Sequence, residues 1–347
     1  MSKNENKPKY LAAVGGQALL EGIMMQSPNG AAIAVRRADG KIIARPKTVK
    51  HAKDKFKPLG WPIIRGIVNF VESMIFGYNC MMESAELSGQ LEAEEDPENM
   101  GKVDRWLNDH FGPKLIAAVG VVGMILGVGL AFLLFMWLPA FIADKLLPAE
   151  NLQKFHPLCE GIMRIIIFVA YIVIVGLEKD IKRTFMYHGA EHKSIFCLEA
   201  DKPLTVENVR MNKRFHPRCG TSFIFVVLIL SILISSVVTL IFPHIGDNRA
   251  VWMAVKLCIA PLVMGIGYEF IKYAGKHDNI VTKILSAPGL WMQRVTTKEP
   301  TDDIIEVGIT SLVASLYGIE SEEFKSLPFD IDYEACIKPE DEKADGR

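Results

Sequence analysis

Residues 221–242 read TSFIFVVLILSILISSVVTLIF, and this run of 22 residues without a charge decides the fold class. A helix of this length covers the hydrocarbon core of a bilayer, which is about 30 Å thick. Leu115–Leu138 extends over 24 residues without a charge and meets the same requirement. The sequence therefore predicts a mainly α-helical membrane protein.

Two shorter apolar stretches, Ile165–Leu177 and Leu257–Tyr268, complete a predicted bundle of four spans. At about 1.5 Å per residue, neither covers the hydrocarbon core alone. Each crosses only if its flanking charges lie inside the bundle or extend to the membrane surface, and the sequence leaves this open. The predicted spans are residues 115–138, 157–177, 221–242 and 251–271.

Basic residues are distributed unevenly among the predicted loops. Glu178–Gly220 contains nine Lys or Arg, against one in Pro243–Ala250 and three in Pro139–Arg164. Because basic loops stay on the cytoplasmic side, residues 178–220 are predicted to form a cytoplasmic loop. Four spans then place both termini in the cytoplasm of a multi-pass plasma-membrane protein. The six cysteines form no close pairs, which favours reduced thiols.

The chain before the first span predicts a small cytoplasmic α+β region over residues 1–60. Two adjacent glycines in Gly15-Gly16-Gln17 indicate a tight turn. A β-hairpin is predicted over residues 31–45, because Asp39-Gly40 supplies the positive φ angles of a two-residue turn. The basic residues nearby lack interleaved aromatics, so we expect no nucleic-acid partner. A solvated surface or contact with anionic lipid explains them.

The other segments outside the spans are mostly helical or acidic. Within the helical region after the fourth span, Ala287-Pro288-Gly289 reads as a turn, and Thr301 as the cap of a helix ending near Tyr317. These segments are an amphipathic interfacial helix at 61–82, an acidic linker and lead-in helix at 83–114, a cytoplasmic helical region at 272–319 and a disordered acidic tail at 320–347.

The predicted cytoplasmic loop contains Tyr187-His188-Gly189-Ala190-Glu191-His192, which has the pattern H-x-x-E-H. Histidines four residues apart lie one turn apart on one face of a helix, so both imidazoles can bind one ion. The pattern is the reversed form of the zinc-peptidase helix, in which the Glu takes a proton from water on zinc. A helix end with two solvated histidines fits this hexapeptide equally well.

A catalytic zinc usually has three protein ligands and one open position, so the two motif histidines need a third ligand. His216 and Cys219 precede the third span, and Cys219 would bind as a thiolate. Glu269, 77 residues after His192, lies at a distance comparable to that of the third ligand in reversed-motif enzymes. Pairing with a neighbouring lysine explains Glu269 equally well. His216 and Cys219 together would close the site, whereas Cys219 or Glu269 alone would leave it open.

Five blocks of the sequence carry a family resemblance. They are Gly15–Met25, Ala34–Gly40, Tyr187–Lys193, His216–Phe223 and Pro288–Pro300. Together they resemble the YqhQ-like family of bacterial membrane proteins, a domain of unknown function for which metal dependence has been inferred. The resemblance covers the chain from about residue 10 to residue 317. It implies a multi-spanning membrane protein and supplies no demonstrated reaction.

The favoured hypothesis is a membrane-embedded hydrolase, most simply a peptidase or amidase, that depends on Zn²⁺ or another divalent metal. The motif histidines would bind the metal with Cys219, His216 or Glu269, and Glu191 would be the general base. The alternatives are a scaffold or assembly factor with a structural metal site, and a small transporter lined by charges such as Glu160. Expected partners are the lipid bilayer and a protein substrate or partner. The substrate and the oligomeric state stay open.

Overall fold

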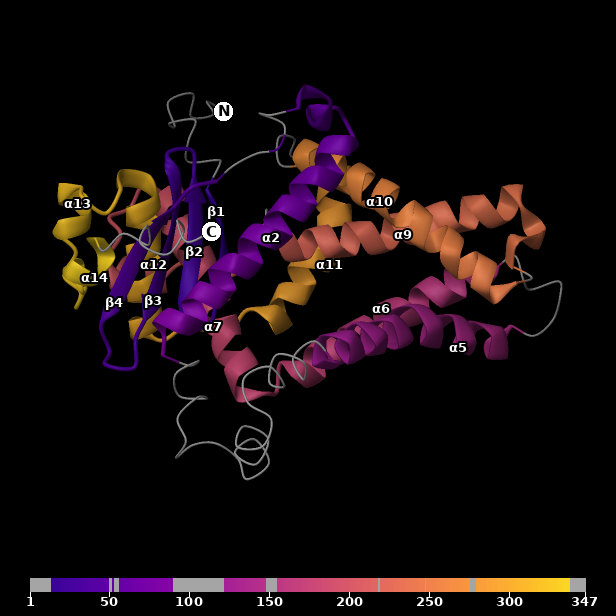
Figure 1. Cartoon of the computed structure of the whole chain (residues 1–347), viewed down its shortest axis with the longest axis horizontal. Helices are drawn as coiled ribbons and strands as arrows, with labels where there is room; N and C mark the ends of the chain where they lie inside the picture. Colours follow the sequence, from indigo (N-terminus) through magenta and orange to yellow (C-terminus); the bar gives the residue numbers. More distant parts are fainter. Residues whose placement is uncertain are drawn as a thin grey trace, which may run out of the picture.

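The molecule has two parts at opposite ends of an elongated shape. A sheet with its covering helices lies at one end, and long apolar helices lie at the other (Figure 1). α2 (Ile64–Leu87) packs against both parts and joins them. The computed structural model describes residues 14–49, 52, 56–89, 122–147, 155–217, 219–246, 248–274 and 279–337.

The sheet has four antiparallel strands in the order β1-β2-β3-β4. β3 and β4 form the hairpin predicted for residues 31–45, with Arg36 opposite Ile42. The predicted two-residue turn is wrong: Gly40 has the one positive φ in this loop (88°), and Arg37 bonds Lys41 across a three-residue loop. This is the turn-plus-bulge geometry that needs a single glycine. The strands are β1 (Gly15–Leu19), β2 (Gly22–Ser27), β3 (Gly30–Arg36) and β4 (Ile42–Lys47).

The glycine pair near the N-terminus lies within β1 and not in the predicted turn. The chain turns instead after Leu19, where Glu21 has a φ of 50°. A glycine is required at position 16 because neighbouring groups lie very close to its backbone. A Cβ there would lie 2.6 Å from the Met24 carbonyl oxygen and 3.1 Å from Cδ of Glu191. The prediction that the glycine pair meets a special backbone requirement is therefore correct, but the cause is close packing and not a turn.

Helices from distant parts of the chain cover the sheet. One face packs against α7 (Lys179–Glu199) and α12 (Asp302–Tyr317), and the other against α2, with Cys80 buried against the strands. The predicted α+β region of residues 1–60 therefore does not enclose its own core. α12 has the predicted bounds, although Thr301 makes no side-chain capping bond.

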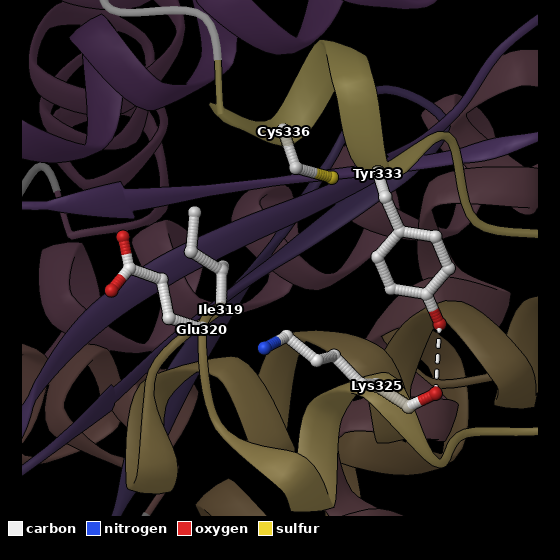
Figure 2. Close-up of a pocket in the computed structure, with 5 residues that line it drawn as sticks. All are labelled: Ile319, Glu320, Lys325, Tyr333 and Cys336. Carbon is white, nitrogen blue, oxygen red and sulfur yellow. Dashed lines mark hydrogen bonds between the residues drawn. The ribbon is translucent and has the colours of Figure 1, made fainter.

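The acidic C-terminal segment is folded as far as Ile337, so its predicted disorder is wrong there; residues 338–347 lie outside the described chain. α13 (Glu322–Lys325) packs on α12, α14 (Tyr333–Ile337) packs on β4, and Ile331 pairs with Ile42. Apolar side chains between the acids drive this docking, since Phe324 is fully buried. A surface pocket of about 520 Å³ lies here, and Figure 2 shows the side chains that line it, which are those of Ile319, Glu320, Lys325, Tyr333 and Cys336.

Four helices of the described chain are long and apolar enough to cross a membrane, as predicted. The first extends from Val122 to Leu146 and so ends later than predicted, and residues 115–121 lie outside the described chain. The two short apolar stretches reach spanning length because their helices include the flanking charges. The bundle comprises the helix at 122–146 with its π-helix η3 (Leu133–Trp137) and α5 (Leu138–Leu146), then α6 (His156–Val175), α9 (Gly220–Ile241) and α10 (Arg249–Ala274).

α11 (Ile280–Thr296) packs against α9 and α6 and carries the chain back to the sheet. It passes through Pro288, so the predicted turn at residues 287–289 is wrong. Proline removes one backbone donor, and the packing of the surrounding helix outweighs that loss. The interfacial helix predicted at 61–82 corresponds to α2, which continues into the predicted linker; residues 90–114 of that linker lie outside the described chain. Short elements are α8 (Val206–Arg210), η2 (Lys57–Gly60) and η5 (Pro243–Gly246).

Candidate metal centre

α7 is fixed in place by contacts on both sides of the H-x-x-E-H motif. Its N-terminus is capped by Glu178, whose carboxylate accepts the N–H groups of Asp180 and Ile181. In the middle, fully buried Tyr187 donates to Glu21 over 3.1 Å, and Arg183 pairs with the same carboxylate. The turn between β1 and β2 therefore sets the rotation of α7 and the direction of its histidines.

Gly189 lets another segment cross α7 at close range. A Cβ at this position would lie 2.1 Å from the carbonyl oxygen of Lys298, while the Lys298 N–H donates to Phe185 over 2.8 Å. The crossing segment follows directly on α11, so the last residue of that helix, Thr296, is brought to His188. The glycine inside the motif thus has a packing role that the spacing of the histidines does not reveal.

Three predicted ligands converge. The ligand atoms of His188, His192 and Cys219 all lie within 4.8 Å of one another, and Nε2 of His188 is 3.2 Å from Sγ of Cys219. Within the described part of the chain, this is the one group of three such side chains close enough to hold a metal ion. Of the three candidates for the third ligand, Cys219 is the one that lies with the two histidines.

Backbone carbonyls orient both imidazoles. Nδ1 of His188 lies 2.9 Å from the Thr296 oxygen, and Nδ1 of His192 lies 2.5 Å from the Arg214 oxygen. A carbonyl only accepts, so each Nδ1 carries the proton and each Nε2 presents a lone pair. This is the arrangement that metal-binding histidines adopt, with one nitrogen held by the protein and the other free for the ion.

Nε2 of His192 is buried without a hydrogen-bond partner of normal geometry. Burial lowers the pKa of His192, and the nearby Cys219 thiol opposes this shift to a smaller extent. A neutral, buried nitrogen that faces only a weak thiol donor gains free energy when a metal ion takes up its lone pair. The donor set of two imidazoles and one thiol therefore fits a zinc ion, which favours nitrogen and sulfur ligands.

Glu191 lies beside this group in an almost water-free position, with 5% of its surface exposed. Burial raises the pKa of its carboxyl group. A bond from the Gly16 N–H acts in the opposite direction, as would protonation of His188 or His216. The strand glycine therefore holds the carboxylate by its backbone and leaves space for it. A carboxyl with a raised pKa is a better proton acceptor near neutral pH.

Two other predicted ligands lie elsewhere. His216 is buried, with its ring 5.7 Å from that of His192 and its Nε2 3.6 Å from a carboxylate oxygen of Glu199. It lies next to the group of three without joining it. Glu269 binds Arg65 of α2 through two contacts, one of 2.6 Å between Nε and Oε1. Glu269 is therefore in an ion pair, but its partner is Arg65 and not the neighbouring lysine considered from the sequence.

Gln293 is a site residue that sequence reasoning missed. It is fully buried on α11, its oxygen accepts the His216 N–H over 2.7 Å, and its amide donates to the His216 oxygen over 2.8 Å. This pair of bonds fixes the loop that supplies both Cys219 and the Arg214 carbonyl. Thr296, Arg214 and Gly16 were also missed, because they act through backbone groups, which leave no residue-type signal.

Comparisons with known proteins identify relatives but no activity. The family described as "Protein of unknown function (DUF1385)" matches residues 61–317. The "Uncharacterized protein YqhQ" of Bacillus subtilis (strain 168) is 33% identical over 314 residues, which cover 90% of this chain and 93% of that protein. No solved structure matches. The function must therefore be argued from the geometry of the centre.

Proposed function

This chain belongs to the DUF1385 family of proteins of unknown function, and we propose that it is an integral membrane hydrolase that depends on zinc and cleaves an amide bond at the cytoplasmic membrane face. The observation that carries the proposal is the convergence of His188, His192 and Cys219 beside buried Glu191. Four helices of spanning length and the basic loop containing α7 support this location.

His188, His192 and Cys219 would hold the zinc, which leaves a fourth position for water or substrate. A thiolate ligand selects zinc over hard cations such as magnesium, which prefer oxygen. Cys219 stands at the N-terminus of α9, where the helix dipole favours negative charge on its sulfur. The carbonyls of Thr296 and Arg214 keep both imidazoles in the binding tautomer.

When bound, zinc supplies Lewis acidity that brings water to a pKa near 7 in related sites. Glu191 accepts the proton as the water oxygen bonds to the carbonyl carbon of the substrate. The carbon–nitrogen bond then breaks, and Glu191 returns the proton to the departing amine. Burial raises the pKa of Glu191, which suits a group that must both take and give a proton. The Gly16 N–H keeps the carboxylate in place during both transfers.

Replacing Glu191 with Gln tests this assignment. We expect about one zinc per chain to remain in lipid nanodiscs, while cleavage of a fluorogenic peptide library falls by about 10²–10⁴-fold. Exposed Glu207 on α8 provides the control, and Glu207→Gln should leave both zinc and cleavage unchanged. Loss of zinc together with cleavage in Glu191→Gln would show that the residue serves the metal site rather than proton transfer.

A scaffold with a structural metal remains the second candidate, because His216 lies close to His192. In that case His216 would move in as a fourth ligand and close the site. X-ray absorption of the zinc protein distinguishes the two functions. Four protein ligands would support the scaffold, and two nitrogens, one sulfur and one exchangeable oxygen would support the hydrolase.

A further inference from the structure

The candidate metal centre lies where the apolar helices meet the sheet. Cys219 precedes α9, and the candidate span within that helix begins at Phe223, about 6 Å further along the axis at 1.5 Å per residue. Thr296, whose carbonyl orients His188, ends α11, and α11 packs along α9 and α6 (Figure 1). Two of the elements that build the centre are therefore in contact with candidate spans.

The side chains of the centre differ in exposure. Glu191 and His192 are 5% and 1% exposed, and Glu191 is bound by Gly16 of the sheet. His188 and Cys219 are partly exposed. Buried Glu191 thus contacts the sheet, whereas the partly exposed ligands are Cys219, which precedes α9, and His188, which contacts the end of α11. The partly exposed ligands are therefore the ones next to the membrane helices.

α11 carries an exposed apolar surface. Ile280, Ile284 and Trp291 are 71%, 63% and 54% exposed, and the spacings of four and seven residues place them on one face of the helix. An exposed apolar face continuous with spanning helices is covered by lipid, and Trp is favoured at the boundary between lipid and water. The lipid boundary therefore extends to within about two turns of Thr296, at 3.6 residues per turn.

We infer that the substrate is a polypeptide segment directly beside a membrane span, which reaches the centre along the membrane surface. The inference rests on the proposed hydrolase function and names its substrate class. A membrane anchor holds such a segment at the depth of His188 and Cys219 and raises its local concentration. A peptide in free solution gains neither advantage.

Two single-span probes test the inference in nanodiscs. They share the same span and the same fluorescent acceptor segment, which begins two residues after the span in the proximal probe and after a 25-residue Gly/Ser linker in the distal probe. Binding is measured first with Glu191→Gln by site-specific photocrosslinking, so that it does not depend on turnover. We expect the proximal probe to crosslink and to be cleaved by the wild type about tenfold more than the distal probe, because its short tether gives the acceptor segment a higher effective concentration near the centre.

The outcomes separate the inference from the proposed function. Preferred binding of the proximal probe with cleavage by the wild type supports both. Preferred binding without cleavage by the zinc-loaded wild type overturns the hydrolase and keeps the membrane-anchored segment as the bound partner. Equal crosslinking of both probes, or stronger crosslinking of the distal probe, overturns the inference even if soluble peptides are cleaved.

Discussion

Two clusters of polar side chains, one in the helical bundle and one around α7, differ in how their polar groups are compensated. In the bundle, Glu160 is held by Arg164 at 2.6 Å and by Lys256 at 2.5 Å from each carboxylate oxygen. At the metal centre, His188, His192 and Cys219 converge without an opposite charge among them. A paired charge cluster is complete by itself, whereas converging lone pairs favour an ion at their centre.

A π-helix supplies a further hydrogen-bond acceptor to the charge cluster of the bundle. Nε of Arg164 donates to the carbonyl oxygen of Phe135 over 2.8 Å, and Phe135 lies in the π-helix η3. The wider π-helical turn changes the backbone bonding there and makes such a contact available. These charges bond one another and the backbone, which favours a structural role over the transport pathway considered from the sequence.

The largest expected effect is the loss of the metal on replacing His188 with Ala. Removing one of three ligands should lower zinc content more than tenfold, because zinc affinity depends on the complete ligand set. Elemental analysis of purified, folded protein measures this, and exposed His244→Ala provides the control. A full zinc equivalent in His188→Ala would mean that the metal, if any, binds elsewhere.

Glu160→Ala should act in the opposite way, on stability and not on metal. It leaves Arg164 and Lys256 buried without their partner, and breaking such a pair costs about 3–5 kcal/mol. The thermal midpoint in detergent should fall markedly, while the zinc content of the folded fraction stays at the wild-type value. Adding Lys256→Met should restore part of the midpoint. An unchanged midpoint in Glu160→Ala would remove the structural role of the cluster.

The same comparison explains which features the sequence reveals. Uncharged runs predict the apolar helices, and the spacing of His188 and His192 predicts one shared helix face, because both are local patterns. Glu269 could not be assigned from the sequence, since its choice between a metal and Arg65 depends on a helix 204 positions away. The folding of the acidic C-terminal segment was not predicted, because only a few apolar residues among many acidic ones pack on β4.

Gln293→Leu is expected to weaken zinc binding without removing a ligand. It deletes both bonds that hold the His216 loop, and losing such support for metal ligands typically costs 10–100-fold in affinity. Competition with a chelator measures the affinity. Asn69 on α2, whose amide donates to Tyr268, is the matched control, because Asn69→Leu should change stability alone. Equal zinc affinities for the two variants would contradict a positioning role for Gln293.

The smallest expected effect is a pH dependence of the metal-free protein. Burial lowers the pKa of His192 and His216 below the ordinary 6.5, so below that pH the unfolded chain binds protons that the folded chain does not. Stability should therefore fall as the pH drops through 6.5. In domains of 150–250 residues, each kcal/mol of lost stability lowers the thermal midpoint by about 2–4 °C. Glu191 acts in the opposite direction, since burial raises its pKa.

Differential scanning in detergent with chelator, between pH 8 and 5.5, measures this dependence. Glu191→Gln should steepen the fall because it removes the opposing group. His216→Phe should flatten it, whereas exposed His244→Phe should leave the slope unchanged. A constant midpoint in the wild type and in Glu191→Gln would mean that the folded centre accepts protons freely. Its imidazoles would then behave as solvated side chains. They would not be the neutral ligands, held by backbone carbonyls, that distinguish this cluster from the paired charges of the bundle.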